Sequence, residues 1–248
     1  MDNTTDGQRR DALKLLAKAA ATAAALPALA GCVTERNWTE APATGRPIHR
    51  PKTDQNLVLT PWEPMDQSSV TQATRSGPAG MQPRSAWATG QPIRGRMVTM
   101  RPLRRITVHH DGMTAFTSTH ESASRSRIDN IRAAHQGRGW GDVGYHYLID
   151  PAGRVWEGRP LGFQGAHVRN HNEGNIGICM LGNYMQQQPN RAQLRSLETT
   201  IGSLMQAHRV RVSDVYTHRE LGNTSCPGKF MQRAMDNMRT KTGVLPSV

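Results

Sequence analysis

The sequence predicts an α/β fold over residues 81–248: a mixed central β-sheet of about five strands, flanked by three helices. Three observations predict it. From about residue 81 onward, short β-branched and apolar runs alternate with segments whose apolar residues recur at helical spacing. One run, residues 175–181, is apolar on both faces, as expected of a central strand buried on both sides. A segment of about 165 residues is also long enough to bury one hydrophobic core.

The strands are predicted from runs of apolar and β-branched residues between turn-forming residues. In chain order they are residues 103–110, 144–150, 153–157, 175–181 and 214–218. Only a turn that contains Pro151 separates the second run from the third, so we expect these two strands to form a hairpin.

Three helices are predicted from apolar residues that recur every three or four positions. Their stripes are Ile128, Ile131 and His135, then Leu194, Leu197, Ile201, Leu204 and His208, and finally Phe230, Ala234, Met235 and Met238. Asn190 is the expected N-cap of the second helix, and Gln193 completes a capping box. Pro227 is suited to the first turn of the third helix. We therefore expect helices to pack on the mixed sheet.

Residues 1–32 resemble a bacterial lipoprotein signal of the twin-arginine type. Arg9 and Arg10 precede a mildly apolar run that has the length of a secretory apolar region and is too short for a durable spanning helix. The run ends in Leu-Ala-Gly-Cys, which resembles the site at which Cys32 would be lipidated. The alternative is an Ala-rich helix of the folded domain. Export predicts a lipid anchor at Cys32 in the periplasm, with the outer membrane preferred because residue 33 is valine rather than aspartate.

Residues 33–80 are predicted to be a flexible, disordered linker between this signal and the folded domain. They are rich in proline, serine, threonine and glutamine and show no sustained apolar period. A flexible segment of ~45 residues has a root-mean-square reach of roughly 35–40 Å. We therefore expect it to let a membrane-anchored domain search the space around its anchor.

The chain carries a formal net charge of +12, which favours an anionic partner. Nucleic acid, membrane headgroups and cell-wall polymer would all qualify. The sequence contains no nucleic-acid-binding motif, and its arginines are scattered rather than gathered on one helix. We therefore expect no nucleic acid partner.

Histidine and cysteine residues far apart in the chain have the pattern of a catalytic zinc site. His218 and Cys226 lie at a predicted strand end and a predicted helix start, where the helix N-terminus favours a thiolate. Catalytic zinc takes three protein ligands and leaves a fourth position for water. The third donor should come from another strand end, which His109 and His110 occupy. Successive strand residues face opposite ways, so only one of the two can reach the metal, and spacing does not choose between them.

Four motifs in order then identify a family. They are RITVHHDG, GWGDVGYHYLIDPAGRVWEGR, GAHVRNHNEGNIGICMLG and THRELGNTSCPG, preceded by PRSAW. Over residues 81–240 the chain resembles the type-2 N-acetylmuramoyl-L-alanine amidases, a superfamily that includes the peptidoglycan recognition proteins and an amidase-type phage lysozyme. The resemblance implies zinc ligands at His109, His218 and Cys226. It also implies catalytic roles for Tyr145 and for Thr224, where the phage enzyme has lysine and the catalytic recognition proteins have threonine.

The resemblance implies an activity as well: zinc-dependent hydrolysis of the amide between the lactyl group of N-acetylmuramic acid and the L-alanine of the stem peptide. The expected partner is peptidoglycan or muropeptides, and the expected protein is a monomer. Two alternatives stay open. One is a non-catalytic peptidoglycan-binding protein on the same fold, although binding-only members typically lack the cysteine that this chain keeps at Cys226. The other is a structural zinc protein or nucleic-acid binder, which three ligands rather than four disfavour.

Four polar residues in loops after strands are predicted to bind the substrate. They are Arg159, His167, Arg169 and Asn172. Their donors could meet the carbonyl and carboxylate groups of a stem peptide, and the alternative for each is hydrogen bonding within its own loop. His135 and His146 are expected to support the sheet or the metal ligands. Cys179 is expected to be a free buried thiol, because a disulfide with Cys226 would remove a zinc ligand.

Overall fold

The computed structural model describes residues 80–240 and 245. The predicted export signal, the lipidation site at Cys32 and the predicted linker up to residue 79 lie outside the described residues. Among the helices that are described, none is both long and apolar enough to span a membrane.

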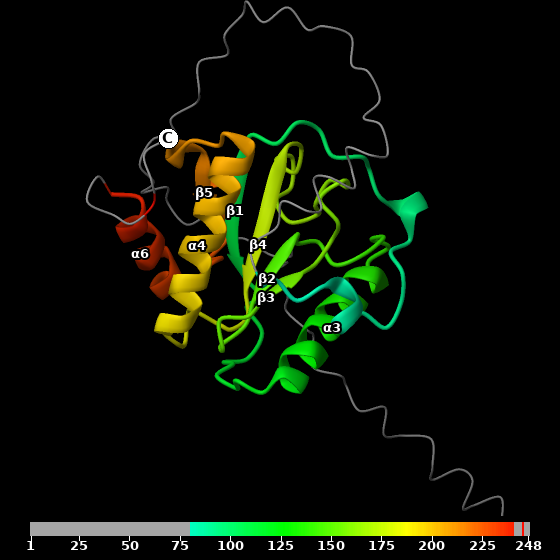
Figure 1. Ribbon diagram of the computed structural model, residues 1–248, viewed down its shortest axis with the longest axis horizontal. Coiled ribbons are helices and arrows are strands. Elements are labelled where there is room, and N and C mark those ends of the chain that lie inside the picture. Colours follow the sequence, from blue (N-terminus) through cyan, green and yellow to red (C-terminus); the bar gives the residue numbers. More distant parts are fainter. Residues whose placement is uncertain (1–79, 241–244, 246–248) are drawn as a thin grey trace, which may run out of the picture.

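Five strands in the described part of the chain form one mixed sheet, as predicted (Figure 1). They are β1 (Arg105–His110), β2 (Tyr147–Ile149), β3 (Val155–Glu157), β4 (Asn175–Met180) and β5 (Val215–Thr217). The order across the sheet is β3-β2-β4-β1-β5. Strands β2, β4, β1 and β5 run parallel, whereas β3 pairs antiparallel with β2 and completes the predicted hairpin. The carboxyl ends of the four parallel strands therefore meet at one edge of the sheet.

Some strands are shorter than their predicted bounds. The second predicted strand starts at residue 144, but β2 starts at Tyr147, so Tyr145 lies just before the strand. The fifth predicted strand ends at residue 218, but His218 already begins the short helix α5 (His218–Leu221). The reason is a capping box that starts the helix. The side chain of Thr217 accepts a hydrogen bond from the backbone N–H of Glu220, and the side chain of Glu220 accepts one from the backbone N–H of Thr217.

Three longer helices form in the predicted regions: α3 (Glu121–Gly137), α4 (Arg191–His208) and α6 (Lys229–Met238). The predicted capping box opens α4, because the Gln193 N–H donates to Asn190 Oδ1 over 2.9 Å and the Asn190 N–H donates to Gln193 Oε1 over 3.3 Å. Pro227 precedes α6 instead of lying in its first turn, because Gly228 is the N-cap residue. Short 3₁₀ turns are η1 (Arg84–Ala86), η2 (Arg94–Arg96) and η3 (Val212–Asp214).

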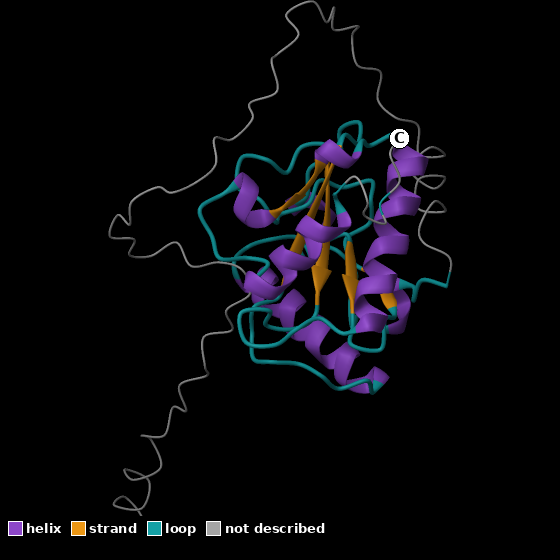
Figure 2. Ribbon diagram, turned by 90° about the vertical axis from the view of Figure 1, so that its left-hand side faces the viewer, coloured by secondary structure: helices purple, strands orange, loops and turns teal. Residues whose placement is uncertain are grey.

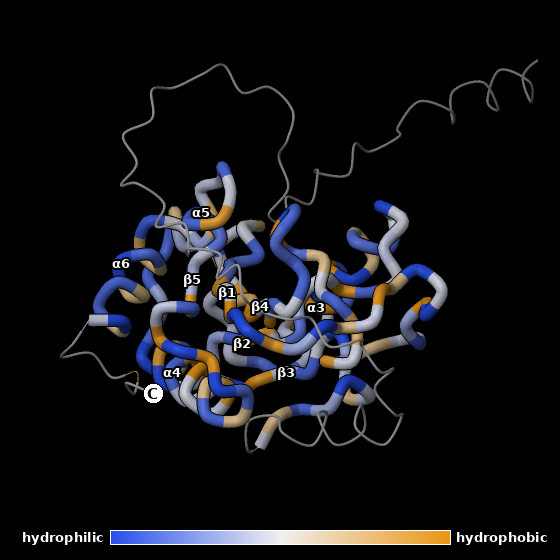
Figure 3. Tube along the Cα trace, turned by 90° about the horizontal axis from the view of Figure 1, so that it is seen from above, coloured by the Kyte–Doolittle hydropathy of each residue, from blue (hydrophilic) through white to orange (hydrophobic). Residues whose placement is uncertain are grey.

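The helices cover both faces of the sheet, which gives three layers (Figures 1 and 2). On one face, Val108 of β1 packs in a hydrophobic cluster with Ile201 of α4 and Met235 of α6. On the other face, Cys179 of β4 packs in a second cluster with Ile128 of α3. Hydrophobic residues follow the strands through the middle of the molecule, between these helices (Figure 3).

Candidate active site

The carboxyl ends of β1 and β5 bring two histidines together. His109 lies near the end of β1, and His218 follows β5 directly. Because the two strands are parallel neighbours, their ends lie side by side. The centroids of the two imidazole rings are 4.7 Å apart.

Cys226 joins this pair through a loop that folds back on α5. The Arg219 N–H donates to the Cys226 carbonyl over 2.8 Å, which closes the loop. The Cys226 Sγ then lies 3.7 Å from His109 Nδ1. One ligand atom from each of His109, His218 and Cys226 lies within 4.8 Å of the other two. The structure thus brings together the three residues that the sequence predicts as zinc ligands.

His110 points away from this cluster, as strand alternation requires. Its Nδ1 accepts the Tyr184 N–H over 3.1 Å on the opposite face of the sheet. Its backbone N–H, however, donates to Cys226 Sγ over 3.4 Å, and its carbonyl oxygen lies 3.8 Å from the same sulfur. Cys226 lies before α6 rather than at the helix start that the sequence predicts. The N–H group that donates to this sulfur therefore belongs to β1.

The donor set fits a catalytic zinc ion. Two imidazoles and one thiolate are groups that zinc prefers, and three protein ligands leave one coordination position open. His109 and Cys226 are buried. The Nδ1 atom of His218 is also buried, and it has no hydrogen-bond partner among the described residues. Because an unpaired buried polar atom is costly and a metal ion would satisfy this nitrogen, these residues could hold a metal ion.

Two further residues predicted from the motifs border the ligand cluster. The ring of the buried Tyr145 lies 5.1 Å from that of His109, centroid to centroid. Thr224 is half-buried, and its Oγ1 accepts the Cys226 N–H over 3.2 Å. A hydroxyl that accepts this bond can still donate its own proton elsewhere. Catalytic roles for Tyr145 and Thr224 stay predictions.

Comparison with known proteins identifies the family. The family model described as N-acetylmuramoyl-L-alanine amidase matches residues 99–229. A peptidoglycan-recognition protein of Drosophila melanogaster is 34% identical over 148 residues, which cover 59% of this chain and 80% of that protein. This chain belongs to the N-acetylmuramoyl-L-alanine amidase family.

The resemblance predicted from the motifs is thereby confirmed. The human N-acetylmuramoyl-L-alanine amidase is 33% identical to this amidase-family protein over 174 residues, which cover 68% of this chain but only 29% of the human protein. Among solved structures, bumblebee PGRP-SA matches with a TM-score of 0.58 at 25% identity, covering 63% of this chain and 93% of that one. The family fold therefore accounts for most of the described residues.

In this amidase-family protein, Arg159 is buried rather than exposed to a substrate. Its guanidinium donates to the carbonyls of Val143 over 2.8 Å, Gln164 over 2.7 Å and Asp142 over 3.1 Å. Burial lowers the pKa of Arg159 to about 10. These bonds explain Arg159 as a residue that holds two loops together, and they give no support to its predicted role in substrate binding.

The other three residues predicted to bind substrate lie in the loop that leads into β4. Asn172 Oδ1 accepts the N–H groups of His167 and Val168 over 2.9 and 2.8 Å, so it shapes this loop. His167 is buried, and its Nδ1 lies 3.0 Å from His109 Nε2. Arg169 is exposed on the same loop, and its substrate-binding role stays a prediction.

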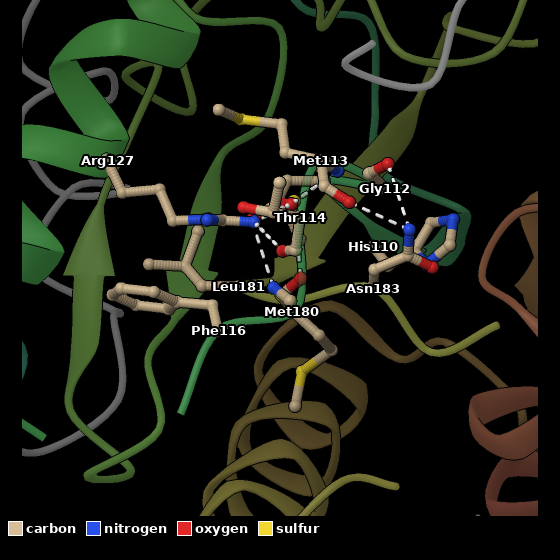
Figure 4. A network of polar contacts seen from close by, with 12 residues as sticks. His110, Gly112, Met113, Thr114, Phe116, Arg127, Met180, Leu181 and Asn183 are labelled. Atoms are coloured by element: carbon tan, nitrogen blue, oxygen red, sulfur yellow. Dashed lines mark hydrogen bonds and ion pairs between the residues drawn. The ribbon is translucent and has the colours of Figure 1, made fainter. Parts of the chain in front are cut away.

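A buried ion pair beside the site is not predicted by the sequence. Arg127 of α3 donates from Nε and Nη2 to the two carboxylate oxygens of Asp111, over 2.7 Å each. Arg127 also donates to the Thr114 carbonyl over 2.7 Å (Figure 4). The Gly182 N–H adds a 3.0 Å bond to Asp111. These bonds fix the end of β1, which carries His109, to α3 and to the end of β4, and no local sequence signal connects such separate elements.

A second polar network holds the segment that carries the other two ligands. The Thr217 N–H donates to Glu220 Oε2 over 2.7 Å, and Arg239 binds both carboxylate oxygens of Glu220 over 2.7 and 2.8 Å. Burial alone would raise the pKa of Glu220, but the bonds from Arg239 and Thr217 lower it. The charged carboxylate thus ties the turn that bears His218 to the helix that follows Cys226. The capping-box spacing of Thr217 and Glu220 is the sequence signal for this network.

Proposed function

We propose that this protein is a zinc-dependent N-acetylmuramoyl-L-alanine amidase. It would hydrolyse the amide between the lactyl group of N-acetylmuramic acid and the L-alanine of the stem peptide, in peptidoglycan or muropeptides. The observation that carries the proposal is the cluster of His109, His218 and Cys226, with ligand atoms within 4.8 Å of one another, in a chain of the amidase family. Three protein ligands suit catalytic zinc, whereas structural zinc usually takes four.

Two hydroxyl groups beside the ligands would assist the reaction. When bound by the three ligands, zinc would polarise the scissile carbonyl and lower the pKa of a water molecule. Tyr145 and Thr224 would each donate a hydrogen bond to the oxygen that becomes negatively charged as water adds to the amide carbon. The burial of Tyr145 and the partial burial of Thr224 favour strong bonds, because little bulk water competes for the same oxygen.

The second candidate is a peptidoglycan-binding protein without activity. It is favoured by the relatives named as recognition proteins, such as the one from Drosophila melanogaster. The two candidates differ in what they require of the metal site. Hydrolysis depends on a thiolate at Cys226, whereas binding of the wall polymer alone needs no metal chemistry.

The variant Cys226→Ser tests the enzymatic proposal. We expect it to lose both stoichiometric zinc, measured by elemental mass spectrometry, and the release of stem peptides from purified sacculi. Cys179→Ser is the matched control, because Cys179 is a buried thiol outside the ligand cluster. A Cys226→Ser protein that releases stem peptides at the full rate would refute the zinc mechanism. A wild-type protein that binds sacculi but releases nothing would favour the binding candidate.

We also propose that residues 81–248 act from a lipid anchor at Cys32 in the periplasm, preferably on the outer membrane. The support is the signal-like segment 1–32 and the proline-rich linker that follows it. Cells that express the full chain would incorporate a labelled fatty acid into it, and Cys32→Ala would abolish the label and move the protein to the soluble fraction. A wild-type protein that is soluble and unlabelled would contradict this location.

A further inference from the structure

His167 connects the ligand cluster to the backbone of β4. Its Nε2 lies 3.2 Å from the Asn175 carbonyl oxygen, and its Nδ1 lies 3.0 Å from His109 Nε2. A carbonyl oxygen can only accept a hydrogen bond, so the proton of His167 is on Nε2. In a neutral imidazole the other nitrogen is then an acceptor, and His109 must donate to it from its own Nε2.

This direction of bonding leaves His109 Nδ1 without a proton. The same atom lies 3.7 Å from Cys226 Sγ, within the ligand cluster. A neutral imidazole binds a metal through its unprotonated nitrogen, and the hydrogen bond of the other nitrogen selects which one that is. The nitrogen that faces the other ligands is therefore the one prepared for a metal ion.

Two glycines make room for the His167 ring. A Cβ atom added at Gly177 of β4 would lie 2.7 Å from His167 Cδ2, and one at Gly165 would lie 2.4 Å from the same atom. A side chain at either position would displace the ring. The position of His167 is thus fixed by two backbone segments as well as by its two hydrogen bonds. Because both ring nitrogens bond within the protein, the geometry does not favour a contact with substrate.

We propose that His167 is a positioning residue of the metal site, which holds His109 in the tautomer with its proton on Nε2 so that Nδ1 binds zinc. The inference rests on the proposed zinc site, and it replaces the predicted role of His167 in substrate binding. Residues of this kind hydrogen-bond the nitrogen of a ligand imidazole that does not bind the metal. Their removal typically lowers metal affinity by roughly 10–100-fold.

Two substitutions separate the hydrogen bond of His167 from its packing. His167→Asn keeps an acceptor oxygen near the position of Nδ1, whereas His167→Leu fills similar space without an acceptor. We expect His167→Leu to weaken zinc affinity by roughly 10–100-fold, and His167→Asn to restore most of that loss. Competition with a chromophoric chelator measures the affinity. Thermal unfolding of each metal-free variant reports any loss of packing separately.

His146→Leu is the matched control. His146 is also a buried imidazole with two hydrogen bonds, but its partners are the Gly177 N–H and the Phe163 carbonyl rather than a ligand of the cluster. We expect His146→Leu to destabilise the fold, because it removes two buried hydrogen bonds, while its effect on zinc affinity stays below the roughly 10–100-fold loss expected of His167→Leu. Gly177→Ala adds an independent variant, because it should weaken zinc binding by displacing the His167 ring although no polar group is removed.

Nitrogen-15 NMR of the imidazoles reads the tautomers directly. In the wild type we expect the His109 proton on Nε2 with and without zinc, and in His167→Leu we expect this preference to be lost. A His109 proton on Nδ1 in the metal-free wild type would overturn the inference, as would a His167→Leu protein that binds zinc as tightly as the wild type. If the wild type bound no zinc, the proposed function would fail, while the tautomer in the metal-free protein would still decide this inference.

Discussion

The side chain of Tyr145 lies among three imidazoles. Its ring centroid is 5.1 Å from that of His109, 5.7 Å from that of His135 and 6.3 Å from that of His167. Tyr145→Phe keeps this packing and removes only the hydroxyl. If the hydroxyl stabilises the developing oxyanion, we expect turnover to fall by ~10²–10³ while zinc affinity stays unchanged. Steady-state kinetics on a soluble muropeptide measures the effect, and an unchanged turnover would remove Tyr145 from the reaction.

His146 must stay neutral in the folded protein. Its Nδ1 accepts the Gly177 N–H over 2.9 Å and its Nε2 donates to the Phe163 carbonyl over 3.0 Å, so a second ring proton would face a donor. Burial, and to a smaller extent the charge of Arg159, lowers the pKa of His146 from 6.5 to about 4. Between these two pH values, the unfolded chain binds a proton at His146 that the folded chain does not.

The stability that depends on neutral His146 is therefore present above pH 6.5 and is lost as the pH falls through about 4. Between neutral pH and about pH 4, we expect the unfolding free energy of the wild type to fall by roughly 2–3 kcal/mol more than that of His146→Leu. Urea unfolding of both proteins across this range measures the difference. If the unfolding free energies of the two proteins changed equally with pH, the folded protein would accept a proton at His146 as readily as the unfolded chain does.

The side chains that reach the site can be predicted only in part. Strand alternation shows that one of His109 and His110 faces the metal, the family motif chooses His109, and the structure places His109 in the cluster. Position in a polar loop suggests substrate contact for Arg159 and His167. That position does not fix the direction of a side chain, however. Arg159 donates to the buried Val143 carbonyl, and His167 donates to the Asn175 carbonyl. Such acceptors have no signature in the local sequence.

Among the secondary-structure elements, α3 and β1 are joined by the ion pair of Arg127 and Asp111. The Asp111 side chain is fully buried, and that of Arg127 is 8% exposed. Removing the guanidinium would leave a buried carboxylate without its cation, so we expect Arg127→Met to lower the unfolding free energy by about 3–5 kcal/mol. Arg125→Met on the same helix is the control, since its pair with Glu121 is exposed and its loss should cost less than about 0.5 kcal/mol. Chemical denaturation measures both, and equal effects would contradict the role of the buried pair.

The elements are predictable where one local pattern dominates. For α4, an apolar stripe and the capping box of Asn190 and Gln193 agree, and the helix forms as predicted. The end of β5 is harder to place, because His218 continues a β-branched run while Thr217 and Glu220 bond locally and begin α5. Side-chain bonds to nearby backbone compete with the strand ladder, and the sequence pattern does not show which of them forms.

Across the whole molecule, the order of strands decides where the site lies. Ile106 pairs with Val215, so β1 and β5 are neighbours although they are distant in the chain. The alternation of strands and helices predicts a mixed sheet flanked by helices, but it does not predict which strands become neighbours. The family motifs supply that information, because they place His109, His218 and Cys226 in one site before any distance is known.

Zinc-dependent cleavage of the lactyl–alanine amide is tested most directly by mass spectrometry of purified sacculi incubated with the protein. Three samples are compared: the zinc-loaded protein, the protein treated with a chelator, and the treated protein after zinc is restored. We predict free stem peptides that begin with L-alanine in the first and third samples and none in the second. Equal release with and without the chelator, or glycan strands that keep their stem peptides in every sample, would contradict a zinc amidase.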